Sequence, residues 1–309
     1  MDEGRERKEM KTQMTNVRSR DRLSELSDCV LLHILNFMET IYAVRTCILS
    51  KRWKVLWKRL TTLTFDAWSF KSVANYNKFV SQVLSSRDGC ISLFKLTFWS
   101  LCSTQSETLN SATRYAALHN VQQLTIDVTS NFINKPNCFD PLIFSCPSLT
   151  ILKLHKSFSV PHLELPTSLQ LPALKSLFLA NVCFTATDNG CTEPFSACIM
   201  LNTLVLGKCS LHEDAEVLLI SNSNLSTLEL DSFEHKIVLS TPNLSSLKIT
   251  NYLGFRYQPL SSTCNLSCLE EGFIYTNPNI SYQVFIGWLQ LFTNVKILTF
   301  SYNTLRLLK

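Results

Sequence analysis

The stretch LSTLELD, residues 225–231, alternates leucine with polar residues. In an extended strand successive side chains point to opposite faces, so Leu228 and Leu230 would lie on one face and Thr227, Glu229 and Asp231 on the other. The leucine face would pack in a core, and the polar face would meet solvent. One such strand cannot bury its own leucines, so it needs neighbours with the same pattern.

The same pattern recurs along the chain. Segments with the spacing L-x-x-L-x-L, some with another apolar residue at a leucine position, begin at residues 93, 121, 149, 174, 201, 225, 244 and 295, and a weaker copy, LSCLEEGF, begins at 266. Such repetition is typical of leucine-rich repeats, whose strands stack into a parallel sheet. Pro, Asn and Ser before several copies, as in TPNL and TCNL, predict turns that lead into the strands. The sequence thus predicts the α/β fold class, with an irregular solenoid whose parallel sheet forms a concave face.

The first hundred residues have a helical pattern instead. Leu31, Ile34, Leu35 and Met38 lie at i, i+3, i+4 and i+7, and a second apolar set follows at 53–57, which together predict three short helices. A unit of about 35 residues is too small to be stable alone without a metal, a disulfide or a partner. Its surplus apolar residues are expected to cover the following domain or another chain.

Composition argues against several classes of function. The net charge of +5 is concentrated early in the chain, so a basic stripe for nucleic acid is not expected. The twelve cysteines include no C-x-x-C pair, which favours buried thiols such as Cys47 and Cys209 over a metal or disulfide set. Residues 1–20 predict a disordered leader without a signal peptide or membrane span. No catalytic or nucleotide-binding motif was found, so neither catalysis nor a cofactor is expected.

Residues 21–66, DRLSELSDCVLLHILNFMETIYAVRTCILSKRWKVLWKRLTTLTFD, resemble the F-box of plant F-box/leucine-rich-repeat proteins, a family that includes F-box/FBD/LRR members. The resemblance rests on LSELSDCVLLHIL, AVRTCILSKRWKVLW and LTFD in the family's order, followed directly by repeats. It implies a leader at 1–20, an F-box at 21–66, a junction at 67–89 and a repeat array at 90–309. The array ends at NTLRLLK, without a polar cap and before any FBD region, as expected of a truncated product.

In that family the F-box docks on a Skp-type adaptor, which joins it to a cullin and a RING subunit, and the repeats hold the protein to be ubiquitinated. The resemblance therefore implies a substrate receptor of an SCF ubiquitin ligase. Because the N-terminus has no apolar run for a signal peptide or membrane span, the chain is expected in the cytoplasm or nucleus. Ser27 and Glu39 stand where the family usually has proline, and Cys29 where it usually has an acidic residue, which bears on the strength of adaptor binding. The alternatives are a repeat scaffold that does not assemble into a ligase and, more distantly, a fragment of an extracellular receptor.

Two sets of binding residues follow. Trp53 and Trp57 would alternatively seal the junction with the first repeat, and Trp99 and Phe178 would alternatively pack under loops. The adaptor is expected to meet apolar residues of the three helices, namely Leu26, Val30, Leu31, Ile34, Leu35, Val44, Ile48, Leu49, Trp53, Leu56 and Trp57. The substrate is expected to meet solvent-facing strand positions, namely Lys95, Thr97, Trp99, Gln123, Thr125, Asp127, Lys153, His155, Phe178, Thr227, Glu229, Asp231, Lys248 and Thr250.

Overall fold

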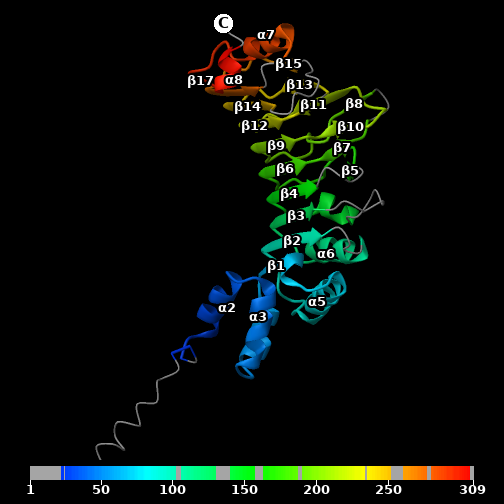
Figure 1. Ribbon diagram of the computed structural model, residues 1–309, viewed down its shortest axis with the longest axis vertical. Helices are drawn as coiled ribbons and strands as arrows, with labels where there is room; N and C mark the ends of the chain where they lie inside the picture. The colour runs from blue at the N-terminus through cyan, green and yellow to red at the C-terminus, as the bar shows by residue number, and fades with distance from the viewer. Residues whose placement is uncertain are drawn as a thin grey trace, which may run out of the picture.

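A computed structural model describes residues 22–23, 25–101, 106–129, 140–156, 163–186, 190–233, 235–251, 260–276 and 280–306. The leader predicted at residues 1–20 lies outside these ranges. Figure 1 shows a stack of strands that rises from β1 to β17, with the first helices below β1.

The first part of the chain forms three short helices, as predicted. They are α2 (Asp28–Asn36), α3 (Thr40–Arg45), continued by the 3-10 turn η1 (Thr46–Ile48), and α4 (Trp53–Leu56), continued by η2 (Trp57–Arg59). The hydroxyl of Ser27 accepts a hydrogen bond from the backbone N–H of Val30, at 3.5 Å, and so caps α2.

The repeats build one sheet of ten strands, all parallel to their neighbours, which confirms the predicted fold class. Each of the nine repeat segments supplies one strand, and the end of the 21–66 segment supplies β1. In spatial order the strands are β1 (Thr62–Asp66), β2 (Lys95–Leu101), β3 (Gln123–Thr129), β4 (Ile151–Lys156), β6 (Ser176–Ala180), β9 (Thr203–Gly207), β12 (Thr227–Asp231), β14 (Ser246–Asn251), β16 (Glu271–Thr276) and β17 (Ile297–Phe300).

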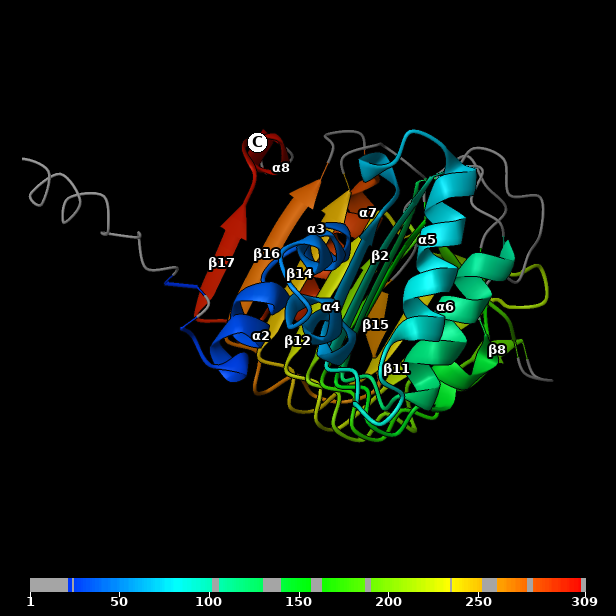
Figure 2. The ribbon, with the colours of Figure 1, turned by 90° about the horizontal axis from the view of Figure 1, so that it is seen from below.

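One face of this sheet is covered by the segments that connect its strands. Figure 2 shows α5 and α6 side by side along this face. The helical segments among these connections are η3 (Ala67–Ser69), α5 (Val73–Ser86), α6 (Ser106–Leu118), η4 (Pro141–Ser145) and α7 (Tyr282–Leu291), and the short helix α8 (Tyr302–Leu305) follows β17. Two small sheets have the orders β10 (Ser210–Leu211), β7 (Val182–Phe184), β5 (Leu163–Leu165), and β15 (Leu260–Ser262), β13 (Lys236–Ser240), β11 (Val217–Ser221), β8 (Cys191–Thr192).

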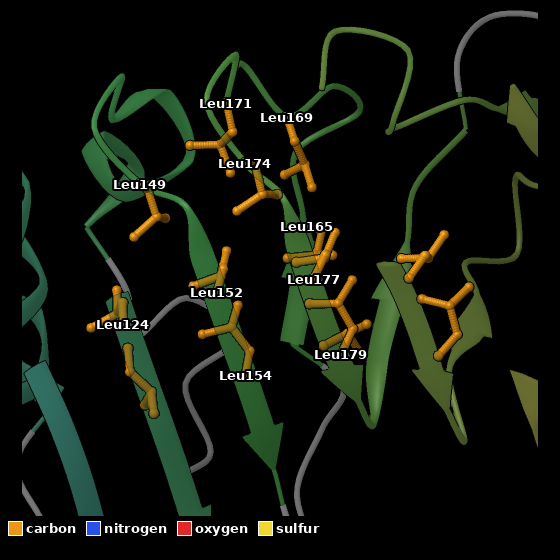
Figure 3. Close-up of a cluster of buried hydrophobic side chains, with 14 of the residues drawn as sticks. Leu124, Leu149, Leu152, Leu154, Leu165, Leu169, Leu171, Leu174, Leu177 and Leu179 are labelled. Atoms are coloured by element: carbon orange, nitrogen blue, oxygen red, sulfur yellow. The ribbon is translucent and has the colours of Figure 1, made fainter. Parts of the chain in front are cut away.

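The repeated leucines form the core between these layers. Leu124, Leu152 and Leu177 are fully buried and lie side by side on β3, β4 and β6 (Figure 3). Burying each such side chain stabilises the fold by about 1.5 to 3 kcal/mol. The predicted turns are present before the strands, where for example the N–H of Leu244 donates to the carbonyl oxygen of Thr241 at 3.2 Å.

The weak copy at residue 266 departs from the leucine pattern in an informative way. Gly272 of β16 lies in register between Leu247 of β14 and Leu298 of β17, so it occupies a leucine position. A Cβ atom at Gly272 would lie 2.5 Å from Cδ1 of Phe292. Phe292 is buried and fills the space that a leucine would take.

The helical unit closes the first edge of the sheet. The side-chain oxygen Oδ1 of Asn36 accepts hydrogen bonds from the N–H groups of Thr61 and Thr62, at 3.2 and 3.0 Å. The hydroxyl of Thr40 accepts from the N–H of Thr64 at 2.8 Å. These bonds satisfy donors that β2 leaves free, so the exposed edge of β1 is not left as a site for unwanted strand pairing.

Candidate functional site

Five of the eleven residues expected to meet an adaptor are buried in the chain itself. Leu31, Leu35, Trp53, Leu56 and Trp57 belong to the same core as the leucines of the first strands. The expectation of direct adaptor contact is corrected for these five in this conformation, because their side chains are already buried within the chain. The burial of Trp53 and Trp57 favours their alternative role, packing within the chain, over contact with an adaptor.

The other six residues remain at least partly accessible. Leu26 and Val44 are half-buried, while Val30, Ile34, Ile48 and Leu49 are exposed, Ile48 with 85% of its surface. Four further exposed apolar residues of the 21–66 segment were missed from the sequence, namely Leu23, Phe37, Tyr42 and Val55. Phe37 follows Ile34 by three positions, a helical spacing that could have identified it.

Charged residues surround these apolar side chains. Arg52 forms an ion pair with Asp28, 2.6 Å between Nη2 and Oδ1, which ties the third helical segment to the first. Lys51, Lys54 and Lys58 form no ion pair within the described residues. The unit therefore presents apolar side chains together with unpaired cations, a combination common at the centre and rim of protein interfaces.

The structure shows the surroundings of the three residues that depart from the usual F-box pattern. Ser27 caps α2, as described above. Oε2 of Glu39 accepts a hydrogen bond from the hydroxyl of Ser69, at 3.0 Å, and Cys29 is exposed. Ser27 and Glu39 thus stabilise the unit locally, where proline would have restricted the backbone.

The other face of the large sheet carries three rows of side chains, one at each alternate strand position, and is called the open face here. Strand register places these residues side by side. The first row is Thr62, Lys95, Gln123, Ile151, Ser176, Thr203, Thr227, Ser246, Glu271 and Ile297. The second row is Thr64, Thr97, Thr125, Lys153, Phe178, Val205, Glu229, Lys248, Phe273 and Thr299. The third row is Asp66, Trp99, Asp127, His155, Ala180, Gly207, Asp231, Thr250 and Tyr275.

All fourteen residues expected to meet a substrate lie in these rows. Trp99, Lys153 and His155 are exposed and most others are half-buried, but Thr97 and Thr250 are buried between neighbouring side chains. The expectation of substrate contact is corrected for these two threonines, because each is only 6% exposed. The sequence list missed all the row members of β1, β9, β16 and β17.

Polar pairs form between neighbouring strands on the open face. Nδ1 of His155 lies 3.0 Å from Oδ1 of Asp127, and Nζ of Lys248 lies 2.5 Å from Oε1 of Glu229. Nζ of Lys153 lies 4.4 Å from the ring centroid of Phe178. Two of the cations of the face are thus already engaged within it.

The described residues hold neither a metal-binding group nor a disulfide. They contain no group of three or more His, Cys, Asp or Glu side chains placed to hold a metal ion, and their cysteines are free. Burial raises the pKa of Cys209 to about 12 and that of Cys198 to about 11, so both thiols stay protonated. None of the helices in the described ranges is long and apolar enough to cross a membrane.

Comparison with known proteins agrees with this architecture. An F-box domain model matches residues 23–64, and the model for the LRR repeats of the FBD-associated F-box protein At5g56370 matches residues 109–266. The chain belongs to the F-box/leucine-rich-repeat family. Similar relatives of this family, all from Arabidopsis thaliana, include the putative F-box/LRR-repeat protein At4g15060, 30% identical over 80% of this chain, and the FBD-associated F-box protein At5g38590, 30% identical over 82%.

The putative F-box/FBD/LRR-repeat protein At4g00315 is 29% identical over 75% of the chain. This F-box/leucine-rich-repeat chain spans 59%, 61% and 53% of the lengths of these three relatives, a little over half.

Proposed function

We propose that this F-box/leucine-rich-repeat protein is the substrate-receptor subunit of an SCF ubiquitin ligase, acting in the cytoplasm or nucleus. Its F-box would dock on a Skp-type adaptor, and through it on cullin and RING subunits. The open face of the array would hold the protein to be ubiquitinated. In this role the chain binds and positions partners, and the chemistry belongs to other subunits.

The supporting observation is the division of apolar residues within the F-box. On α2, Leu31 and Leu35 face the core, while Val30, Ile34 and Phe37 remain on the outside. Ile48 and Leu49 are exposed at the end of the second helical segment. These exposed side chains do not contribute to the packed core of the F-box. Clusters of exposed apolar side chains on a small unit mark interaction sites.

The competing proposal is a repeat scaffold that binds partners without joining a ligase. It would need the same open face but no adaptor site on the F-box. Ser27, Cys29 and Glu39 favour this alternative, since they depart from the usual family residues. Binding to a Skp-type adaptor distinguishes the two proposals, because only the ligase receptor requires it.

Replacing Ile34 and Ile48 together with aspartate is expected to lower affinity for a plant Skp-type adaptor by at least about 100-fold, because two carboxylates would be buried in an apolar contact. Ile34 is suitable as the target on α2 because it is exposed, whereas aspartate at the buried Leu35 would destabilise the fold itself. Co-expression followed by pull-down and titration of the purified pair measures the effect.

The matched control is Leu118→Asp with Ile199→Asp, which adds the same charge at two exposed apolar positions of the array. The control should bind the adaptor as the unmodified chain does. No capture by the folded, unmodified chain would contradict the ligase role and favour the scaffold.

A further inference from the structure

The third row of the open face places a tryptophan between two carboxylates. Trp99 of β2 is in register with Asp66 of β1 on one side and with Asp127 of β3 on the other. The tryptophan side chain is exposed, with 39% of the residue surface accessible. Neighbouring strands lie about 4.8 Å apart, so strand register places an aspartate next to Trp99 on each side along the row.

Both carboxylates keep an oxygen for a ligand. Oδ1 of Asp66 accepts a hydrogen bond from the N–H of Trp68 at 2.9 Å, and Oδ1 of Asp127 lies 3.0 Å from Nδ1 of His155. In the described part of the chain, no Lys or Arg pairs with either carboxylate. An exposed aromatic ring between two carboxylates that neither Lys nor Arg neutralises attracts a positive side chain, through the ring face and the charges together.

The rest of the third row determines how long a segment would have to be to reach a second carboxylate. The next residues in the row after His155 are Ala180 and Gly207, and Asp231 on β12 follows them. Because alanine has only a methyl group and glycine has no side chain, the surface is shallow between His155 and Asp231. The row contains no Lys or Arg between β1 and β16. An extended chain laid along it would therefore meet negative charge at both ends of a shallow stretch.

From Trp99 on β2 to Asp231 on β12 there are five strand-to-strand steps in the sheet order. At about 4.8 Å a step the distance is about 24 Å, and an extended segment advances about 3.3 Å per residue, so it spans the row with about seven residues.

We propose that the third row binds an extended, basic segment of the partner protein. One Arg or Lys lies over Trp99 between Asp66 and Asp127, and a second, about seven positions along, reaches Asp231. This inference rests on the proposed function and specifies the class of protein that the open face holds.

The test selects peptides from a random display library on the full-length chain and measures the affinity of the selected peptides in solution. The expected peptides carry two basic residues about seven positions apart and bind more weakly as salt is added. Trp99→Leu, and Asp66→Asn with Asp127→Asn, should each lower their affinity about tenfold. Asp231→Asn should weaken peptides with two basic residues and leave peptides with one unaffected.

The control Glu213→Gln removes one carboxylate from an exposed position between β10 and β11, away from the open face, and should leave binding unchanged. Thermal unfolding of each variant shows whether a loss of affinity reflects a loss of fold. Three results would overturn the inference. The library yields no binding peptides, the selected peptides are not enriched in Arg and Lys, or they bind the folded Trp99→Leu variant as tightly as the unmodified chain. Because this assay omits the adaptor, failure of adaptor capture is seen separately and contradicts only the ligase role.

Discussion

Replacing Arg87 with methionine is expected to lower the free energy of unfolding by about 3 to 5 kcal/mol, because a buried guanidinium and its hydrogen bonds to three carbonyl groups are lost. Arg87 follows α5 and is 6% exposed. Its Nε donates to the carbonyl of Leu60 at 2.8 Å, and its Nη1 and Nη2 donate to the carbonyls of Ile91 and Ser92 at 2.8 and 2.9 Å. Nη1 also donates to the hydroxyl of Tyr115 at 3.0 Å.

These partners belong to different parts of the molecule. Leu60 ends the F-box helical unit, Ile91 and Ser92 lead into β2, and Tyr115 lies on α6. One guanidinium therefore joins the F-box to the first covering helices of the array. Chemical denaturation of the purified chain measures the loss, and Arg87→Lys should recover only part of it, since an ammonium cannot reproduce the planar set of donors.

The control is Arg114→Met on α6, whose guanidinium is largely exposed and lies 3.3 Å from Oδ2 of Asp140. Asp140 is buried, but water solvates the Arg114 side of this pair, so Arg114→Met should cost clearly less stability than Arg87→Met. Equal losses in the two variants would contradict the role given to Arg87.

A local readout accompanies the Arg87 experiment. Burial, and then the nearby Arg87 charge, hold the pKa of His119 below its usual value. Removing the guanidinium should raise the pKa of His119, as followed by NMR titration of the folded Arg87→Met variant. An unchanged titration would show that the charge does not act on this histidine.

The second large loss of stability is expected from mutations at Gly272 and Phe292. Phe292→Ala should lower the free energy of unfolding by about 3 to 5 kcal/mol, because it leaves a cavity over β16. Gly272→Leu restores the repeat pattern yet should cost about 1 to 3 kcal/mol, since its Cβ atom alone would clash with the Phe292 ring.

The double variant tests the physical link between these two residues. A leucine at 272 can occupy the space vacated by the ring, so the double variant should lose less stability than the two single losses added together. Thermal or denaturant unfolding of the unmodified chain, the two single variants and the double variant gives the double-mutant cycle. Additive losses would mean that Phe292 does not stand in for the missing leucine.

The repeat spacing was sufficient to predict the parallel sheet and its two faces. Leu228 and Leu230 lie inside, and Thr227, Glu229 and Asp231 lie in the rows of the open face, because strand alternation depends only on local geometry. The three short helices and the turns before the strands were likewise local properties. Gly272 had no such signal, since the ring that replaces its side chain comes from a residue twenty positions later.

The sequence by itself determined which residues alternate, where strands and helices form, and that the F-box has more apolar side chains than it can bury alone. The tertiary structure alone decided which of them the array covers, so that Leu35 and Trp57 are core residues while Ile34 and Ile48 are surface. It also decided that Asp66, Trp99 and Asp127 meet in one row. The physical reason is that burial and register depend on packing between strands about thirty residues apart, which local periodicity does not specify.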